Sequence, residues 1–341
     1  MAKSERVRLK APGALRVAIC GCGSVSRRHV QNLLELPEVD VVALADVRHE
    51  ACTRLRDEEL VPRGRHCSVF HTLDEQLRLA QLDAVVIATP YYLHYPQAKA
   101  ALEAGVHVLL EKPMVTSPTQ ARELMTLACK KKRVLALAYQ GPYTPEFNYI
   151  RRVRREGILG QIRTVGGFIN QDWLAGVKGT WRVRRKQAGG GILYDAGSHL
   201  LHAVLWLTEL EPAEVFAFAE NCKQEVEVVA AVIVHFSNGA VATLMANGDS
   251  RLPRNGIQLH GTEGVIVTSV YGEFLEHYID GQKVKYPSVS GGSATPEANF
   301  IAAIRGQEEL LCPADYGLKL ARLLEAIYRS IRTRKPVKPA K

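Results

Sequence analysis

The fold is decided by one stretch near the start of the chain, LRVAICGCGSVS at residues 15–26. Residues 15–20 form an apolar run typical of a buried strand, and the glycines that follow lead into a helical pattern. Gly21 permits a tight turn, and Gly23 lets backbone N–H groups approach a pyrophosphate at the start of the helix. The stretch therefore predicts a dinucleotide-binding unit built on a parallel sheet.

A second apolar run, residues 39–45, ends on Asp46, at about the distance from the glycines where such units carry an acidic residue. The Asp46 carboxylate can accept hydrogen bonds from a ribose diol, and its charge would repel a 2′-phosphate. The predicted cofactor is therefore NAD in preference to NADP. Arg48 leaves the alternative open, because its side chain could turn outward or accommodate the phosphate.

Strand and helix patterns alternate through the first part of the chain, which is typical of β-α-β units and a parallel sheet. Further strands are expected at 66–70, 84–88, 106–110 and 134–138, and helices at 50–59, 73–79, 95–104 and 118–130. The strand at 106–110 runs directly into Glu111-Lys112-Pro113. Open parallel sheets bind their ligands outside the carboxyl ends of the strands, so Lys112 places a cation where chemistry is expected.

From about residue 141 the pattern changes to long alternating runs joined by hairpin signals such as Ser237-Asn238-Gly239. Strands are expected at 162–170, 215–219, 226–236, 240–247, 257–260, 265–269 and 274–279, helices at 145–156, 299–304 and 316–333, and a loop at 288–294. A chain of 341 residues is too long for one typical core. We therefore expect an α/β Rossmann domain with a parallel sheet at 14–140. An α+β domain with a mixed or antiparallel open sheet follows at 141–341, for substrate binding and oligomerisation.

A second group of candidate residues follows Gly189-Gly190-Gly191. If a helix begins near Asp195, then Asp195 and His199 project from one face, and the helix N-terminus favours the ionised carboxylate. His199 could then take a hydroxyl proton while Lys112 stabilises the developing alkoxide. Simpler interpretations stay open: Asp195 could cap the helix, His199 could be a core histidine, and Lys112 could pair with Glu111.

These motifs, in this order, resemble those of the Gfo/Idh/MocA oxidoreductases, the family of glucose-fructose oxidoreductase and inositol dehydrogenase. The resemblance runs from Leu15 to Pro336 and is carried by Gly21-x-Gly23 with His29, Ala88-Thr89-Pro90-Tyr91-Tyr92-Leu93-His94, Glu111-Lys112-Pro113, Glu156-Gly157-Ile158-Leu159-Gly160, Thr180-Trp181-Arg182, the triple glycine with Asp195 and His199, and Leu324-Glu325-Ala326-Ile327-Tyr328-Arg329-Ser330. It implies that Lys112, Asp195 and His199 form the catalytic group.

The motifs and the resemblance together give a set of expected contacts. Cofactor contacts are expected at Gly21, Gly23, Ser24, Val25, Asp46, Arg48, Thr89, Pro90, His94, Glu111 and Lys112. Substrate contacts are expected at Lys112, Trp173, Arg182, Asp195 and His199.

Three positions depart from the family pattern. Ser26 replaces the third glycine of the dinucleotide motif, and a small residue still permits close packing of helix and strand. Gln140-Gly141-Pro142-Tyr143 lacks the arginine that many members carry there, which leaves the substrate preference open. His202 stands where many members have an aspartate three residues after the catalytic histidine, which leaves the orientation of His199 open.

The resulting prediction is an NAD-dependent sugar or polyol dehydrogenase of carbohydrate metabolism. One alternative is a redox-neutral, NAD-dependent glycoside hydrolase, in which the same residues perform a transient oxidation. Another is a regulatory protein that senses a dinucleotide without catalysis. Asp195, His199 and His202 could suggest a metal site, but no further ligand pattern supports one, and no metal is expected.

Charge and hydrophobicity limit which partners and which cellular location we expect. The net charge of +9 gathers in short basic clusters without any zinc finger, basic zipper or RNA-binding motif, so no nucleic-acid partner is expected. No apolar run reaches the roughly 20 residues that cross a bilayer, and the start of the chain does not read as a secretory signal. We expect a cytoplasmic protein with a carbohydrate substrate and no membrane partner. An open sheet with one uncovered face favours a homodimer or homotetramer.

Overall fold

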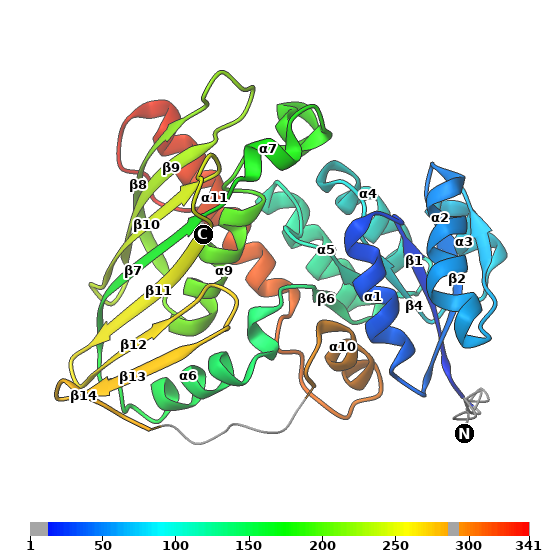
Figure 1. Ribbon diagram of the computed structural model, residues 1–341, viewed down its shortest axis with the longest axis horizontal. Coiled ribbons are helices and arrows are strands. Elements are labelled where there is room, and N and C mark those ends of the chain that lie inside the picture. Colours follow the sequence, from blue (N-terminus) through cyan, green and yellow to red (C-terminus); the bar gives the residue numbers. More distant parts are fainter. Residues whose placement is uncertain (1–12, 286–292, 341) are drawn as a thin grey trace. The chain divides into compact units, whose positions relative to one another are not determined.

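The chain divides into two compact units in a computed structural model that describes residues 13–285 and 293–340 (Figure 1). The first unit contains the chain up to Glu111, Glu123–Ala138 and Thr295–Leu310. The second contains Lys112–Arg122, Tyr139–Ala294 and the chain from Leu311 onward. The expected division is a single cut between residues 140 and 141, whereas each unit includes a segment from the other side of that cut. Most of the expected loop at 288–294 lies outside the described residues.

The first unit is built on a six-stranded sheet whose neighbouring strands all run parallel. The strands lie in the order β3-β2-β1-β4-β5-β6. Their bounds are β1 (Leu15–Cys20), β2 (Val39–Ala45), β3 (Ser68–Phe70), β4 (Ala84–Ile87), β5 (His107–Leu110) and β6 (Leu135–Leu137). The strand order reverses between β1 and β4, which is where such sheets bind a dinucleotide. This sheet confirms the predicted Rossmann architecture.

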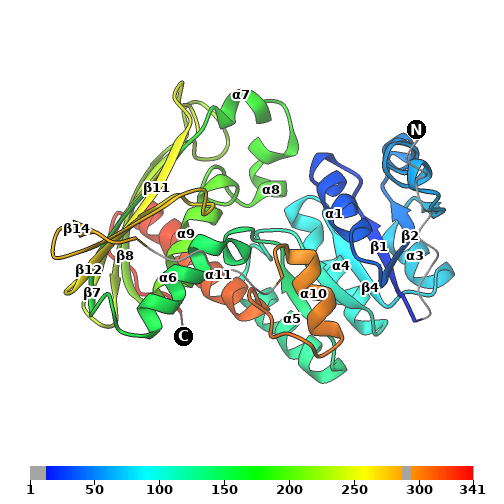
Figure 2. The ribbon, with the colours of Figure 1, turned by 60° about the horizontal axis from the view of Figure 1, so that its bottom comes forward.

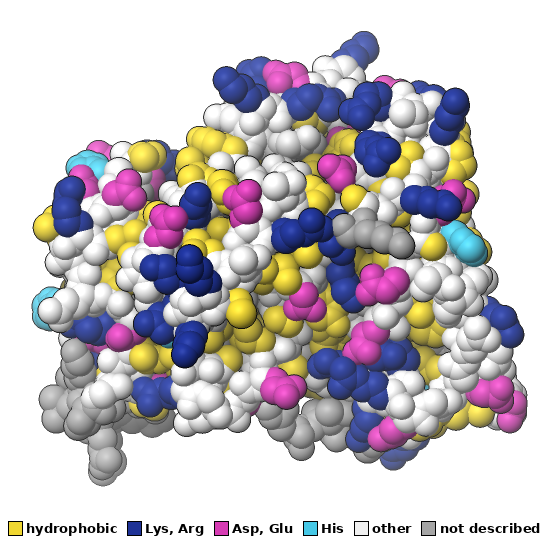
Figure 3. Space-filling model, turned by 180° about the vertical axis from the view of Figure 1, so that it is seen from behind, with side chains coloured by type: hydrophobic (Ala, Val, Ile, Leu, Met, Phe, Trp, Pro, Cys, Tyr) yellow, Lys and Arg dark blue, Asp and Glu magenta, His cyan; other side chains and the backbone are white. Residues whose placement is uncertain are grey.

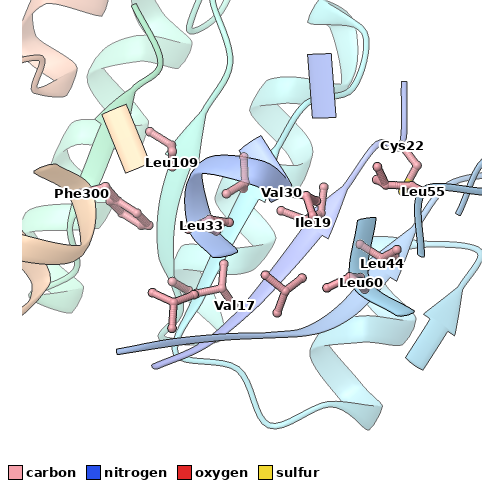
Figure 4. Packing of buried hydrophobic residues seen from close by; sticks show 14 of the residues in the cluster. Val17, Ile19, Cys22, Val30, Leu33, Leu44, Leu55, Leu60, Leu109 and Phe300 are labelled. Carbon is pink, nitrogen blue, oxygen red and sulfur yellow. The ribbon is translucent and has the colours of Figure 1, made fainter. Parts of the chain in front are cut away.

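Helices pack on this sheet and share its buried core. They are α1 (Ser24–Leu34), α2 (His49–Leu55), α3 (Leu73–Leu79), α4 (Tyr91–Glu103), α5 (Pro118–Lys131) and α10 (Pro296–Ile304). Val17 and Ile19 of β1 pack with Val30 and Leu33 of α1 in a fully buried cluster that Phe300 of α10 joins (Figure 4). Because parallel strands are buried on both faces, they read as continuous apolar runs, and this is why the sequence predicts them well.

Two helices of this unit differ most from their expected bounds, and α10 also begins three residues early, at Pro296. The helix expected at 50–59 is α2 followed by one π-helical turn, Arg56–Leu60. The wider turn buries both Glu59, which accepts hydrogen bonds from α1, and the apolar Leu60. The helix expected at 95–104 begins one turn earlier, at Tyr91 after the N-cap Pro90, and contains Pro96.

The second unit is built on an eight-stranded sheet in the order β14-β13-β12-β11-β7-β10-β9-β8. The strands are β7 (Ile162–Asn170), β8 (Pro212–Glu220), β9 (Val229–Phe236), β10 (Val241–Asn247), β11 (Arg254–Gly261), β12 (Gly264–Thr268), β13 (Leu275–Ile279) and β14 (Gln282–Lys283). Neighbours are antiparallel except β7 and β10, which run parallel. The sheet is therefore mixed.

Helices cover one face of this sheet. The unit contains α6 (Pro145–Arg155), α7 (Trp173–Val177), α8 (Arg185–Ala188), α9 (Ala196–Thr208) and α11 (Ala314–Thr333). α9 packs on β7 and β10, and α11 packs on β8. Figure 2 shows α6, α9 and α11 on the same side of the sheet. Buried and exposed residues alternate along β9 and β10, as expected for a sheet with one covered face.

Positively and negatively charged side chains lie next to one another on the surface. Arg151, Arg154 and Arg155 of α6 all contact Glu209. On the face shown in Figure 3, Lys and Arg side chains lie among Asp and Glu side chains. Among residues 13–285 and 293–340, no helix combines the length and apolar character that crossing a bilayer requires.

A buried histidine ties α10 to the rest of the first unit. His29 of α1 contacts Glu297 through Nδ1, and its Nε2 lies 3.1 Å from Oε1 of Glu111. Burial alone would lower the pKa of His29. The hydrogen bonds and charges of the two glutamates outweigh burial and raise that pKa to about 9. His29 is therefore an imidazolium that joins two carboxylates from distant parts of the sequence.

This cluster predicts a pH dependence of stability. Because the pKa of His29 is higher in the folded protein than in the unfolded chain, its stabilisation is complete below about pH 6.5 and disappears as the pH rises through 9. The expected loss is about 3 kcal/mol in the free energy of unfolding, measured by urea unfolding at pH 6, 7.5 and 9. His29→Gln should be less stable at pH 6 and should lose the steep decline. His66→Gln, at an exposed position, is the control. An unchanged pH profile in His29→Gln would contradict the prediction.

Candidate functional site

The turn between β1 and α1 has the geometry of a dinucleotide-binding loop. Gly21 has φ +90°, and a Cβ there would lie 2.6 Å from the carbonyl oxygen of Ala88, so only glycine fits. The fully buried Ser26 donates a hydrogen bond from its hydroxyl to the carbonyl of Gly21. The residue that replaces the third glycine therefore also fixes the turn.

The start of α1 leaves room for a phosphate group. Gly23 is the N-cap of α1, and no side chain caps the helix. A Cβ on Gly23 would meet no atom within 4 Å, so the packing of the described residues does not require glycine there. Ser24 and Val25 form the exposed first turn. Open space at an uncapped helix N-terminus suits the pyrophosphate of a dinucleotide.

Asp46 is held beside this turn. Its Oδ2 accepts a hydrogen bond from the N–H of Cys22 at 2.8 Å, and its Oδ1 accepts one from the N–H of Arg48 at 2.9 Å. A carboxylate has about four acceptor positions, so both oxygens can still accept from a ribose diol. The side chain of Arg48 is 69% exposed, with Nε 3.6 Å from Oδ1. The residues present therefore fit NAD.

The predicted cofactor residues that follow β4 and β5 are partly engaged within the protein. Thr89 donates its hydroxyl proton to Gln97, and the buried His94 donates from Nε2 to the carbonyl of Thr89 at 2.9 Å. Glu111 contacts His29, as described above. The side chains of His94 and Glu111 therefore fix these strand ends.

In the second unit, the side chains of Lys112, Trp173 and Arg182 converge on Asp195, the N-cap of α9. Nζ of Lys112 lies 3.1 Å from Oδ1 of Asp195. The indole N–H of Trp173 donates to Oδ2 at 2.9 Å, and Nε of Arg182 lies 3.1 Å from the same oxygen. The helix begins at Ala196, so the sequence correctly places Asp195 at a helix start. Lys112 also precedes a cis peptide bond to Pro113.

The charges around Asp195 keep its carboxylate ionised. Burial alone would raise the pKa of Asp195. The positive charges of Lys112 and Arg182 outweigh burial, together with hydrogen bonds from Trp173 and Lys112, and hold that pKa well below its usual range. Asp195 is therefore ionised throughout the physiological pH range. Trp173 is buried with its N–H on this carboxylate, which makes it a partner of Asp195.

His199 lies between two tyrosine rings. Its ring centroid is 5.5 Å from that of Tyr139 and 5.1 Å from that of Tyr271, both in edge-on geometry. The two tyrosines come from the segment after β6 and the segment after β12, far from α9 in the sequence. Because neither belongs to a motif, sequence reasoning missed both. The hydroxyl of Tyr271 accepts a hydrogen bond from Gln171 at 3.3 Å.

His202 is buried against the Tyr139 ring and the Cys312 thiol. Its ring stacks on Tyr139 with centroids 3.8 Å apart, and its Nε2 lies 3.2 Å from Sγ of Cys312. Burial lowers the pKa of His202 to about 3, so the ring carries no charge. Tyr139 thus contacts both His202 and His199. Within the described ranges, no cluster of three or more His, Cys, Asp or Glu side chains is arranged to hold a metal ion.

Comparison with known proteins identifies the family. Residues 15–139 match the family described as "Oxidoreductase family, NAD-binding Rossmann fold", and residues 147–267 match the "GFO/IDH/MocA C-terminal domain". The chain belongs to the GFO/IDH/MocA family. It is therefore an oxidoreductase with an NAD-binding Rossmann domain, which confirms the family, fold and cofactor that the sequence predicts.

Several relatives of this GFO/IDH/MocA protein are named enzymes. The scyllo-inositol 2-dehydrogenase (NADP(+)) IolW of Bacillus subtilis is 26% identical over 311 residues, 83% of this chain and 86% of that one. The D-glucoside 3-dehydrogenase of Escherichia coli is 32% identical over 197 residues, 57% of this chain and 54% of that enzyme. The solved structure of levoglucosan dehydrogenase in complex with NADH has a TM-score of 0.85 at 21% identity, covering 96% of this chain and 100% of that one. The last match shows the shared fold.

The position of Asp46 predicts how cofactor choice responds to mutation. Asp46→Ala should weaken NADH binding about 10- to 100-fold, because the ribose diol and the Cys22 N–H both lose an acceptor. Asp46→Asn keeps an acceptor but loses the charge, so it should mainly narrow the preference for NADH over NADPH. Both constants are measured by calorimetric titration. Asp57→Ala is the control, because Asp57 is exposed and contacts its sequence neighbour Arg56. Tighter binding of NADPH than NADH by the wild type would overturn the assignment.

Proposed function

We propose that this protein is an NAD-dependent dehydrogenase that oxidises a hydroxyl group of a sugar, a polyol or a sugar derivative. The observation that carries the proposal is the contact of Lys112 with Asp195, a cation directly after β5 held by a carboxylate that stays ionised. The named relatives support the substrate class, because scyllo-inositol, D-glucosides and levoglucosan are all polyhydroxylated rings. The named relatives are dehydrogenases, and none supports the hydrolase alternative.

Each residue of the site has a separate role in the proposed oxidation. Bound NAD supplies the acceptor for the hydride of the carbinol carbon. His199 removes the hydroxyl proton, and Lys112 stabilises the negative charge that develops on the oxygen. Asp195 keeps the ammonium group of Lys112 in place, while Trp173 and Arg182 fix the carboxylate itself. Arg182, whose side chain is 38% exposed, is the member of this group most open to a substrate hydroxyl.

Different residues of the first unit contact different parts of NAD. Gly21, Gly23, Ser24 and Val25 bind the pyrophosphate, with the backbone N–H groups at the start of α1 as donors. Asp46 binds the ribose diol, with Arg48 at its edge. Thr89 and Pro90 line the end of β4, and His94 and Glu111 support that edge through the hydrogen bonds described above.

The experiment that tests the function measures stoichiometry. The protein is incubated with NAD and a panel of free sugars, polyols, sugar acids and aryl glycosides, while NADH absorbance and aglycone release are followed together. A dehydrogenase forms about one NADH per molecule oxidised, because hydride transfer is the net reaction. Lys112→Met and His199→Ala should each lower kcat at least about a hundredfold, while NADH binding persists, particularly in His199→Ala. Lys178→Met, at an exposed position in the second unit, is the control.

Two outcomes would contradict the proposed activity, and a third would contradict the assigned catalytic residues. Aglycone release over many turnovers without net NADH would make the protein a glycoside hydrolase. Tight NADH binding with no turnover of any compound would favour a dinucleotide sensor. Near-normal kcat in both variants would remove Lys112 and His199 from the mechanism.

We further propose a cytoplasmic homodimer or homotetramer that pairs through the uncovered face of the eight-stranded sheet. Phe218, Ile233 and Met245 are 50%, 48% and 43% exposed on neighbouring strands β8, β9 and β10. A second copy of the same sheet would bury these side chains. Light scattering should give a multiple of the 37.7 kDa chain mass, and Ile233→Glu should lower it. A wild-type mass of one chain would contradict this assembly.

A further inference from the structure

Glu227, between β8 and β9, accepts hydrogen bonds from the backbone N–H groups of residues 191–193, where the triple glycine ends. Its Oε1 accepts from the N–H of Gly191 at 2.8 Å and of Leu193 at 3.1 Å. Its main-chain carbonyl accepts from the N–H of Ile192 at 2.9 Å. One residue thus determines the path of three successive peptide units.

Gly191 packs tightly against the backbone of Glu227, and Tyr328 contacts the Glu227 side chain. A Cβ on Gly191 would lie 1.9 Å from the carbonyl oxygen of Glu227, so no other residue fits. Tyr328 of α11 donates its hydroxyl proton to Oε1 at 2.6 Å, and its ring stacks on Tyr194 with centroids 5.3 Å apart. Oε1 therefore receives three donors from two separate segments.

The segment that Glu227 holds continues directly into the start of α9. The N–H groups of Tyr194 and Asp195 both donate to the carbonyl of Gly191 at 3.1 Å. The N–H of Gly197 donates to the carbonyl of Ile192 at 2.7 Å. The backbone position of Asp195 is thus set by a turn in which the N–H groups of residues 191–193 donate to Glu227.

We propose that Glu227 is a positioning residue for catalysis, which holds the turn at 191–193 so that the Asp195 carboxylate meets Lys112. This inference rests on the proposed function, because it gives the Lys112–Asp195 contact a part in turnover. Glu227 acts through the backbone of the turn at 191–193. Its effect belongs to the second unit, so the dinucleotide loop of the first unit should be untouched.

The surroundings of Glu227 define the conservative variant. Burial raises the pKa of Glu227, against the hydrogen bonds from Tyr328 and the backbone N–H groups. Oε2 is buried and has no hydrogen-bond partner among the described residues. In Glu227→Gln the amide oxygen can take the place of Oε1 and keep all three donors. In Glu227→Ala the same three donors lose their acceptor.

The test compares these two variants by hydrogen exchange and by kinetics in the full-length protein. Glu227→Ala should speed amide exchange in the peptide 189–195 at least about tenfold, whereas Glu227→Gln should leave it near wild type. With the compound of the panel that the wild type oxidises fastest, Glu227→Ala should lower kcat at least about tenfold and leave the Kd for NADH unchanged. Glu227→Gln should restore kcat to within about threefold of wild type.

A matched control separates positioning from general stability. Tyr149→Phe removes the buried hydrogen bond between the Tyr149 hydroxyl on α6 and Nδ1 of His277 on β13. It should lower Tm without lowering kcat of the folded enzyme. Unchanged exchange at 189–195 in Glu227→Ala would overturn the inference even if no substrate is found. Wild-type kcat in Glu227→Ala would also overturn it, whereas no turnover by the wild type would count against the proposed function alone.

Discussion

The carboxylate of Asp195 is the point on which the second unit's site depends. Three donors from three separate segments meet on its two oxygens: Lys112 after β5, Trp173 at the start of α7, and Arg182. A buried carboxylate is costly unless it is paired and hydrogen-bonded, so the segments are held together by a shared electrostatic requirement. Removing any one donor would leave the buried carboxylate with fewer hydrogen-bond partners, which costs stability.

The sequence predicted the parts of the fold and of the site that depend on local pattern. β1, β2, β7 and α3 match their expected bounds, because apolar runs and turn residues within each segment determine them. Lys112 and Asp195 were predicted from a strand end and a helix start, and the structure brings them into contact. The parallel pairing of β7 with β10 was not predicted, since pairing depends on segments distant in the chain.

What sequence reasoning missed was the supporting residues. Tyr139, Tyr271 and Glu227 have no motif, and each acquires its place only through tertiary contacts. His202 illustrates the same limit, because a histidine near catalytic residues suggests a charged or metal-binding group. The structure instead shows a neutral ring stacked on Tyr139, which in turn contacts His199. An aromatic contact thus occupies the position where a carboxylate was expected.

The return of Thr295–Leu310 to the first unit has a consequence for how the chain folds during synthesis. Phe300 fills part of the core under α1, and Glu297 meets the His29 imidazolium. The dinucleotide-binding unit therefore cannot complete its core when its own strands emerge from the ribosome. It must wait until residues 295–310 have been made, with the second unit's sheet already translated. Synthesis order and folding order are thus uncoupled in this protein, and truncation after the last Rossmann strand would leave α1 with an exposed apolar surface.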